Sequence, residues 1–303
     1  MRKNILISTM VATLLFTTTT LCASNTNEEI KVSKSSQLSI EKESKKQKET
    51  FHEAPKEIVD GFNQTLEAIS ALEENNSDKA KKALKEATKN FNLALKKAPK
   101  LDLVPFAQEI VVHEFLGSSE SVKKSLALAE NLIEKYDTQT ARMVMMPLED
   151  EMIITTNSIP MKLYPIATKD ALKALEKGDK EGALEILNVS LNTIVSETVL
   201  MPVALLVAED LVLSASAIDK EKKEDALNLL TLAQDELKKA VYLGYTTKHA
   251  PAYQALDEEI EAVKKEIKGK NIVEKLYDKV KESFQSLIGE NRTESRDKDN
   301  NTK

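Results

Sequence analysis

The sequence predicts an all-α protein, built as an irregular bundle of many helices. Three observations lead to this fold class. The 303 residues include only 7 glycines and 8 prolines, too few turn-forming residues for an all-β fold. Between residues 51 and 268 apolar residues recur at steps of three and four, the spacing of amphipathic helices. The third observation is an internal repeat that links the end of one helix to the start of the next.

The repeat has one pattern of residue types, which occurs three times. An apolar residue is followed by alanine at +8, an apolar residue at +12, a small residue at +15 and an apolar residue at +19. The copies are Leu72, Ala80, Leu84, Ala87 and Phe91; Leu175, Ala183, Leu187, Ser190 and Ile194; and Ile218, Ala226, Leu230, Ala233 and Leu237. Small residues allow paired helices to approach closely, as in tetratricopeptide hairpins. The copies are unevenly spaced, so the pattern predicts helical hairpins within an irregular bundle and disfavours a regular solenoid.

The N-terminus has the features of an export signal. Arg2 and Lys3 precede an apolar stretch that is too short to span a membrane, and small residues around Ala23 form a cleavage site. We expect residues 1–23 to be a signal peptide cleaved near Ala23 and the protein to be periplasmic. Cys22, the only cysteine, is not expected to carry a lipid, because bulky Leu21 precedes it. Cleavage would leave no cysteine and change the net charge from −6 to −8.

The rest of the chain divides by composition into four segments. Residues 24–50 form a polar leader, predicted to be disordered and to become helical only near its end. Residues 51–268 form the helical domain, residues 269–288 a C-terminal amphipathic helix, and residues 289–303 a disordered tail. The helices predicted inside the domain cover residues 56–72, 78–97, 106–116, 120–136, 199–218, 225–242 and 252–268. The most apolar, 199–218, is expected to lie at the centre.

One stretch departs from the helical period. Between Ala141 and Pro160 the β-branched and apolar residues follow one another without a spacing of 3.6. This favours a short β-hairpin near residues 142–156, with its turn around Pro147 to Glu151.

No pattern of an enzyme active site occurs in the sequence. His52, His113 and His249 are far apart and form no HxxxH or HExxH pair, so a metal site is not expected. GxSxG and glycine-rich phosphate loops are also absent. We therefore predict a protein that is not an enzyme and has no cofactor, and its negative charge disfavours nucleic acid as a partner.

Two acidic residues in the most apolar helix are candidate pH-responsive groups. Burial of Glu209 or Asp210 would raise the pKa of its carboxyl, so that the group could take up a proton in mild acid. The alternative is that both residues occupy the one exposed stripe of the helix, or pair with a lysine.

Two further sets of residues are candidate interaction surfaces. Five of the eight methionines fall close together, and flexible thioethers suit contacts with varied partners, although they also fill cores. The C-terminal helix presents an apolar face to a membrane surface, to a partner or to its own bundle, and docking on its own bundle is the favoured alternative. The residues are Met143, Met145, Met146, Met152 and Met161, and Ile272, Leu276, Val280, Phe284 and Leu287.

Several short motifs in the domain resemble one family of exported bacterial proteins, the YfdX family. They are Met146-Pro147-Leu148, Ile159-Pro160, Tyr164-Pro165, the segment 171–179 (ALKALEKGD) with Ala183 and Leu187, Met201-Pro202, the segment 226–237, and Leu243-Gly244-Tyr245. The resemblance covers roughly residues 55–268. It implies a periplasmic, mainly helical, oligomer-forming protein that is associated with resistance to acid, heat and other stress. The resemblance implies no catalytic residues.

These observations together predict a non-enzymatic stress-response protein that acts through protein contacts. Its partners would be protein clients, which it would bind as a chaperone does under acid or heat stress, or further copies of itself in a homo-oligomer. The alternative is a helical-repeat scaffold that binds one envelope partner or a small ligand.

Overall fold

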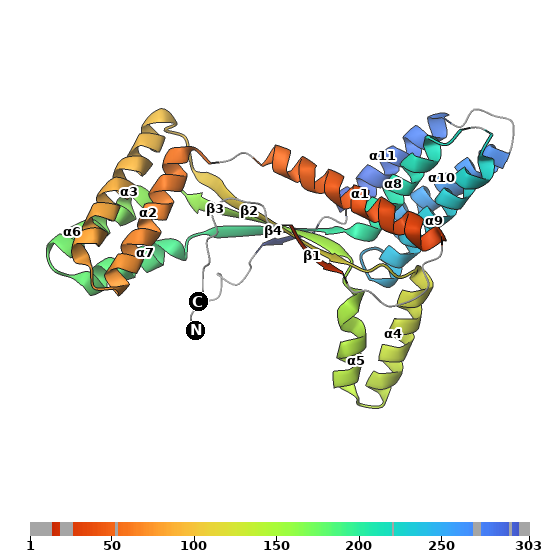
Figure 1. The fold of residues 1–303 in the computed structure, drawn as a ribbon, viewed down its shortest axis with the longest axis horizontal. Coiled ribbons are helices and arrows are strands. Elements are labelled where there is room, and N and C mark those ends of the chain that lie inside the picture. Colours follow the sequence, from red (N-terminus) through yellow and green to blue (C-terminus); the bar gives the residue numbers. More distant parts are fainter. Residues whose placement is uncertain are drawn as a thin grey trace.

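The structure, a computed structural model, describes residues 14–18, 27–51, 54–219, 221–268, 274–290 and 293–296. It is mostly helical, as predicted, and its helices gather in two lobes at opposite ends of a long, narrow sheet (Figure 1). A third group, a pair of helices, projects sideways from one end of the sheet (Figure 1).

The sheet has five strands in the order β1-β2-β3-β4-β5. Its long central strands, β2 (Leu103–Glu114), β3 (Glu151–Pro160) and β4 (Val195–Pro202), are antiparallel, and Ile154 of β3 lies opposite both Ile110 and Val199. Strand β1 (Leu14–Thr18) pairs parallel to β2, and β5 (Thr293–Arg296) pairs antiparallel to β4. The β2–β3 register shifts between Pro105 and Ala107, since proline has no N–H for the ladder.

The first lobe consists of two helical hairpins. They are α2 (Lys56–Glu73) with α3 (Ser77–Lys97), and α6 (Tyr164–Glu176) with α7 (Lys180–Leu191). The aromatic rings of Phe62 and Phe91 pack on Tyr164, with ring centroids 5.9 and 5.5 Å apart. The two hairpins contain the first two copies of the repeat, and their alanines Ala80, Ala87 and Ala183 are buried where the helices meet. The predicted helical hairpins are confirmed.

The second lobe surrounds one apolar helix, α8 (Val203–Ser216), with α1 (Asn27–Thr50), α9 (Lys223–Tyr242) and α11 (Glu274–Glu290). Helix α10 (Pro251–Lys268) packs on α9 and α11. Nine of the fourteen residues of α8 are buried. The hairpin α8–α9 contains the third repeat copy. The predicted central helix is therefore correct in place, although it begins later than expected, because residues 199–202 belong to β4.

The projecting pair of helices, which we call the arm, comprises residues 119–148. Helix α4 (Ser119–Glu134) turns through Tyr136, whose φ of 61° lies in the left-handed region, into α5 (Thr138–Met145). The carboxylate of Asp137 caps α5 by accepting a hydrogen bond from the backbone N–H of Thr140. A short 3-10 helix, η1 (Met146–Leu148), leads back towards β3.

Two predicted elements in the middle of the chain are wrong. The helix predicted at 106–116 is the strand β2, whose β-branched residues Ile110 to Val112 pair with β3. The hairpin predicted near 142–156 has only one strand: its first half is helical in α5 and η1, while its second half, in β3, pairs with β2 and β4.

The predictions for the two ends of the chain also need correction. Helix α1 occupies most of the leader that was predicted to be disordered, because Ser35, Ser36 and Ser39 lie at helical spacing, allow a close approach to α8, and flank the buried Ile40. Strand β5 falls inside the predicted C-terminal tail. Strand β1 falls inside the predicted signal peptide, whose cleavage site lies outside the described residues. No helix within the described ranges is long and apolar enough to cross a membrane.

The C-terminal helix offers a test of the second lobe. Phe284 of α11 is fully buried in the core that contains α8. We expect Phe284→Ala to lower the free energy of unfolding by about 3–5 kcal/mol, through lost apolar transfer and the cavity left behind. Urea denaturation would measure the change. The exposed neighbour Lys281→Ala is the control, expected to stay within about 0.5 kcal/mol; equal effects of the two substitutions would mean that α11 does not dock on the lobe.

Candidate functional site

In the described part of the chain, α4 of the arm packs on α5 and α9, and the arm exposes several apolar side chains. Among its residues, Val122, Ala129 and Ala141 are buried where α4 and α5 meet. Several large apolar side chains instead face solvent: Leu128, Ile133, Tyr136, Met143, Met145 and Met146. Met143 is 70% exposed, Met146 60% and Tyr136 91%. All six residues belong to one projecting pair of helices, and this concentration of exposed apolar side chains makes the arm a candidate contact surface for another molecule.

The predicted group of five methionines therefore separates into two. Met143, Met145 and Met146 form part of the exposed surface of the arm. Met152 and Met161 are fully buried in two different cores. The separation follows from the local structure, because β3 and the turn after it direct these two side chains inwards, whereas α5 packs mainly on α4 among the described elements.

The apolar face of the C-terminal helix is not available as a surface. Val280, Phe284 and Leu287 are fully buried in the second lobe, and Leu276 packs against the same core. Ile272 lies outside the described residues. The alternative in which this helix docks on its own bundle is the one that the structure shows.

Glu209 and Asp210 lie on α8, partly buried, between two neighbouring helices. The Asp210 carboxylate accepts a hydrogen bond from the Ser35 hydroxyl of α1 at 2.5 Å. The Glu209 carboxylate accepts one from the side-chain amide of Gln285, in α11, also at 2.5 Å. These residues therefore hold α8 to its neighbours, and their titration in mild acid stays a prediction.

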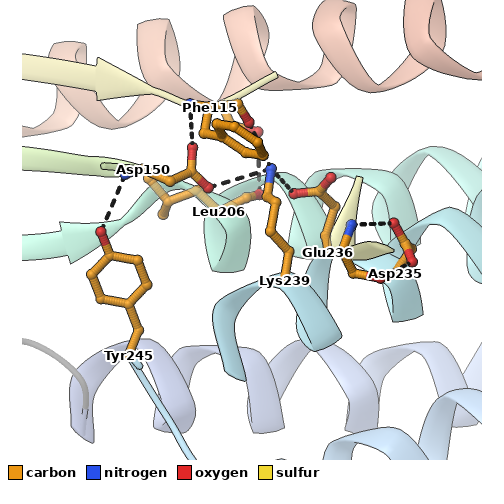
Figure 2. Close-up of polar contacts among 9 residues, drawn as sticks. Phe115, Asp150, Leu206, Asp235, Glu236, Lys239 and Tyr245 are labelled. Atoms are coloured by element: carbon orange, nitrogen blue, oxygen red, sulfur yellow. Dashed lines mark hydrogen bonds and ion pairs between the residues drawn. The ribbon is translucent and has the colours of Figure 1, made fainter. Parts of the chain in front are cut away.

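A buried ionic cluster lies at the base of the arm, where the sheet meets α9. Asp150, just before β3, is fully buried, and Glu236 and Lys239 on α9 are each 2% exposed (Figure 2). The Lys239 ammonium lies 3.3 Å from a carboxylate oxygen of Asp150 and 2.7 Å from one of Glu236. It also donates a hydrogen bond of 3.1 Å to the backbone carbonyl of Phe115. One cation is thus shared by two carboxylates.

This arrangement changes the proton affinity of all three groups. Burial raises the pKa of the Glu236 carboxyl to about 7, although the Lys239 ammonium opposes the shift. Burial also raises the pKa of Asp150, against the same ammonium and the backbone N–H groups of Phe115 and Ala204. The two carboxylates outweigh desolvation at Lys239 and raise the pKa of its ammonium. With both acids ionised the cluster has a charge of −1, and one bound proton makes it neutral.

The raised pKa of Glu236 has a defined effect on stability. The ordinary pKa of a glutamate carboxyl is 4.5, and that of Glu236 in the folded protein is about 7. At pH values between these two, Glu236 keeps a proton in the folded protein that it has released in the unfolded chain. The free energy of unfolding therefore falls as the pH rises through this window. The cluster should favour the folded state most in mild acid.

Further hydrogen bonds attach both ends of the arm to this cluster. The backbone N–H of Phe115 donates to the Asp150 carboxylate at 3.0 Å. At the start of α4, the Ser119 backbone N–H and hydroxyl donate to the carboxylate of Asp235 (Figure 2). On the other side of Asp150, its backbone N–H donates to the Tyr245 hydroxyl at 3.2 Å, and that hydroxyl donates to Glu151 at 2.9 Å.

A pocket of about 920 Å³ opens beside the cluster, between α1, α9 and the start of α4. Its walls are acidic, with Glu28, Glu224, Asp225, Asp235 and Glu236 among the lining residues. In the described part of the chain, no group of three or more His, Cys, Asp or Glu residues is placed to hold a metal ion.

The ionic cluster is not evident from the sequence, although the position of Glu236 indicates part of it. On α9 the buried residues Leu229, Ala233, Glu236 and Ala240 follow steps of four and three, so Glu236 falls on the apolar face, where a charge demands a partner. Asp150 left no such signal, because it stands in the acidic run Glu149-Asp150-Glu151, which is typical of an exposed turn.

Removing the cation tests the cluster. We expect Lys239→Met to lower the free energy of unfolding by about 3–5 kcal/mol at pH 8, because two buried carboxylates lose their counter-charge. At pH 5.5 the loss should be smaller, since protons can neutralise the carboxylates. Chemical denaturation at both pH values measures this, with exposed Lys238→Met as the control. A loss that is the same at both pH values would contradict the assignment.

Comparison with known proteins gives a family match and similar solved structures, one of which is described here. Residues 62–200 match the family described as YfdX protein. A solved structure of Salmonella Typhi YfdX is 17% identical to this chain, with a TM-score of 0.32, over 47% of this chain and 88% of that one. No curated protein matches the sequence significantly. The matched residues contain the first helical lobe from Phe62 onwards, the arm and most of the sheet, so this part of the chain is similar to the YfdX family.

Proposed function

We propose that this protein is a non-catalytic, exported stress protein that binds partly unfolded polypeptides through its arm. The observation that carries the proposal is the exposed apolar surface of α4 and α5, above all Met143, Met145 and Met146. Unfolded chains expose varied apolar segments, so a protein that holds them needs a surface that adapts its shape. Methionine is unbranched and polarisable, and it supplies such a surface.

The position of the arm supports this role. It projects away from both lobes (Figure 1), so that a bound segment could contact α4 and α5 without displacing the cores of the lobes. Other exposed apolar residues, such as Ile166 on α6 and Val189 on α7, belong to helices whose opposite faces are buried in the first lobe. Single exposed apolar residues of that kind are normal on a protein surface.

The sequence supports the cellular compartment in this proposal. The N-terminal pattern favours export to the periplasm. A protein that only holds unfolded clients does not need a nucleotide-driven cycle there. The YfdX resemblance implies acid and heat stress as the conditions. Self-association through the same arm surface is part of the proposal, because a second copy would cover it in the absence of a client.

The proposal predicts that substitution of the arm methionines weakens client binding. A variant with Met143→Ser and Met146→Ser should be needed at about thirtyfold higher concentration to suppress aggregation of a heat- or acid-unfolded client, since about 1 kcal/mol of apolar contact is lost per side chain. Light scattering of the client at increasing protein concentration measures the effect.

The matched control replaces two equally exposed apolar residues on the first lobe, Ile166→Ser with Val189→Ser. This control should suppress aggregation as the wild type does. Equal loss in both double variants, or no suppression by the wild type at any ratio, would count against the arm as the client-binding surface. Thermal unfolding of each variant shows whether folding is retained.

A further inference from the structure

The arm is joined to the rest of the chain at a neck, beside which α4 also packs on α9. The chain leaves β2 at Phe115, forms the whole arm, and returns at Asp150 just before β3. These two residues lie side by side, since the Phe115 backbone N–H donates to the Asp150 carboxylate at 3.0 Å. The neck is closely packed: a Cβ atom added to Gly117 would meet the ring of Phe115 at 2.5 Å.

One buried side chain contacts both chain segments of the neck. Lys239 reaches from α9 to the carbonyl of Phe115 on one side and to the carboxylate of Asp150 on the other, at 3.1 and 3.3 Å. Its third partner is Glu236, one turn back on the same helix, at 2.7 Å. Glu236 therefore shares the single ammonium of the cluster with Asp150 and with the carbonyl of Phe115.

The two carboxylates do not have equal support. Asp150 accepts a hydrogen bond from the Phe115 backbone N–H and is also stabilised by the backbone N–H of Ala204, in addition to its ion pair. Within the described part of the chain, the Glu236 carboxylate is stabilised by Lys239 alone. These extra hydrogen bonds favour the ionised form of Asp150, so we expect a proton that the cluster takes up to reside mainly on Glu236.

We propose that Asp150, Glu236 and Lys239 form a proton-sensitive clasp that fixes the arm in mild acid and loosens it at alkaline pH. With Glu236 protonated, the cluster is neutral and Lys239 interacts fully with Asp150 and Phe115. With Glu236 ionised, a net negative charge is buried and the ammonium is drawn away from the neck. This inference concerns how firmly the arm is fixed, and its relevance to function rests on the proposed binding of unfolded polypeptides by the arm.

The other charged groups around Glu236 shape this response. Asp235 on α9 is an acidic neighbour of Glu236. Glu114, at the end of β2, interacts with Asp150 and Lys239, and burial raises the pKa of its carboxyl, while the nearby Ser36 of α1 opposes that shift. Lys264 of α10 and Glu28 of α1 line the adjoining pocket together with Glu236.

One further ion pair crosses the neck. His113 of β2 lies 3.3 Å from Glu149, which directly precedes Asp150. Because imidazole is charged only when protonated, this pair is a competing source of pH dependence, and the test must separate it from Glu236.

Distance measurements between two spin labels test the clasp without any client. The labels are placed at Lys135→Cys, at the tip of the arm, and Lys265→Cys, on the exposed face of α10, in the full chain with Cys22→Ser. We expect a narrow distance distribution at pH 5.5 and one about twice as broad at pH 8.5, because a loosened neck gives the arm several orientations. In Glu236→Gln the distribution should be narrow at both pH values.

Matched variants separate the clasp from its neighbours. Glu224→Gln, an exposed acid on the same helix, should keep the wild-type response, and so should His113→Gln and Glu114→Gln. An unchanged wild-type distribution between the two pH values overturns the proposal, as does a response that is lost in His113→Gln or Glu114→Gln but kept in Glu236→Gln. Since no client is present, these outcomes are independent of whether the arm binds unfolded chains.

Discussion

The buried ammonium of Lys239 joins three parts of the chain that sequence keeps far apart. It contacts the end of β2 through Phe115, the start of β3 through Asp150, and its own helix α9 through Glu236. The second lobe, the sheet and the start of the arm therefore meet at this ammonium, whose contacts with Phe115, Asp150 and Glu236 are drawn in Figure 2. A charge in such a position is tolerated only with partners, so the relative placement of these three parts depends on the same few polar contacts.

The two lobes, in contrast, depend on apolar packing of helical hairpins. In each of α2–α3, α6–α7 and α8–α9, small residues at the crossing points allow close approach, and large apolar residues fill the space between helices. Such contacts are local along the chain and do not depend on protonation. The lobes therefore provide a fixed frame, and the sheet spans the distance between them (Figure 1).

The difference between local and distant contacts explains what could be predicted from sequence. The repeat around Leu84 and Leu187 predicts hairpins because each partner lies within about twenty residues. Ile110 to Val112 were assigned to a helix because their partner strands, β3 and β1, lie about forty and about ninety-six residues away in sequence, and no local pattern specifies such pairing. Similarly, α1 has only Ile40 as a large buried residue, so its docking on α8 depends on small serines that look polar in sequence.

The functional surfaces were predictable to different degrees for the same reason. Methionines that cluster in sequence indicated a contact surface, and three of them are exposed because the short α5 packs mainly on α4 among the described elements. The clasp was not predictable, because Asp150 and Lys239 become neighbours only when β3 and α9 are in place. Apolar packing alone at the neck would hold the arm equally at any pH. An ionic joint with two acids and one base instead makes the attachment of the arm depend on a proton, while both lobes remain folded.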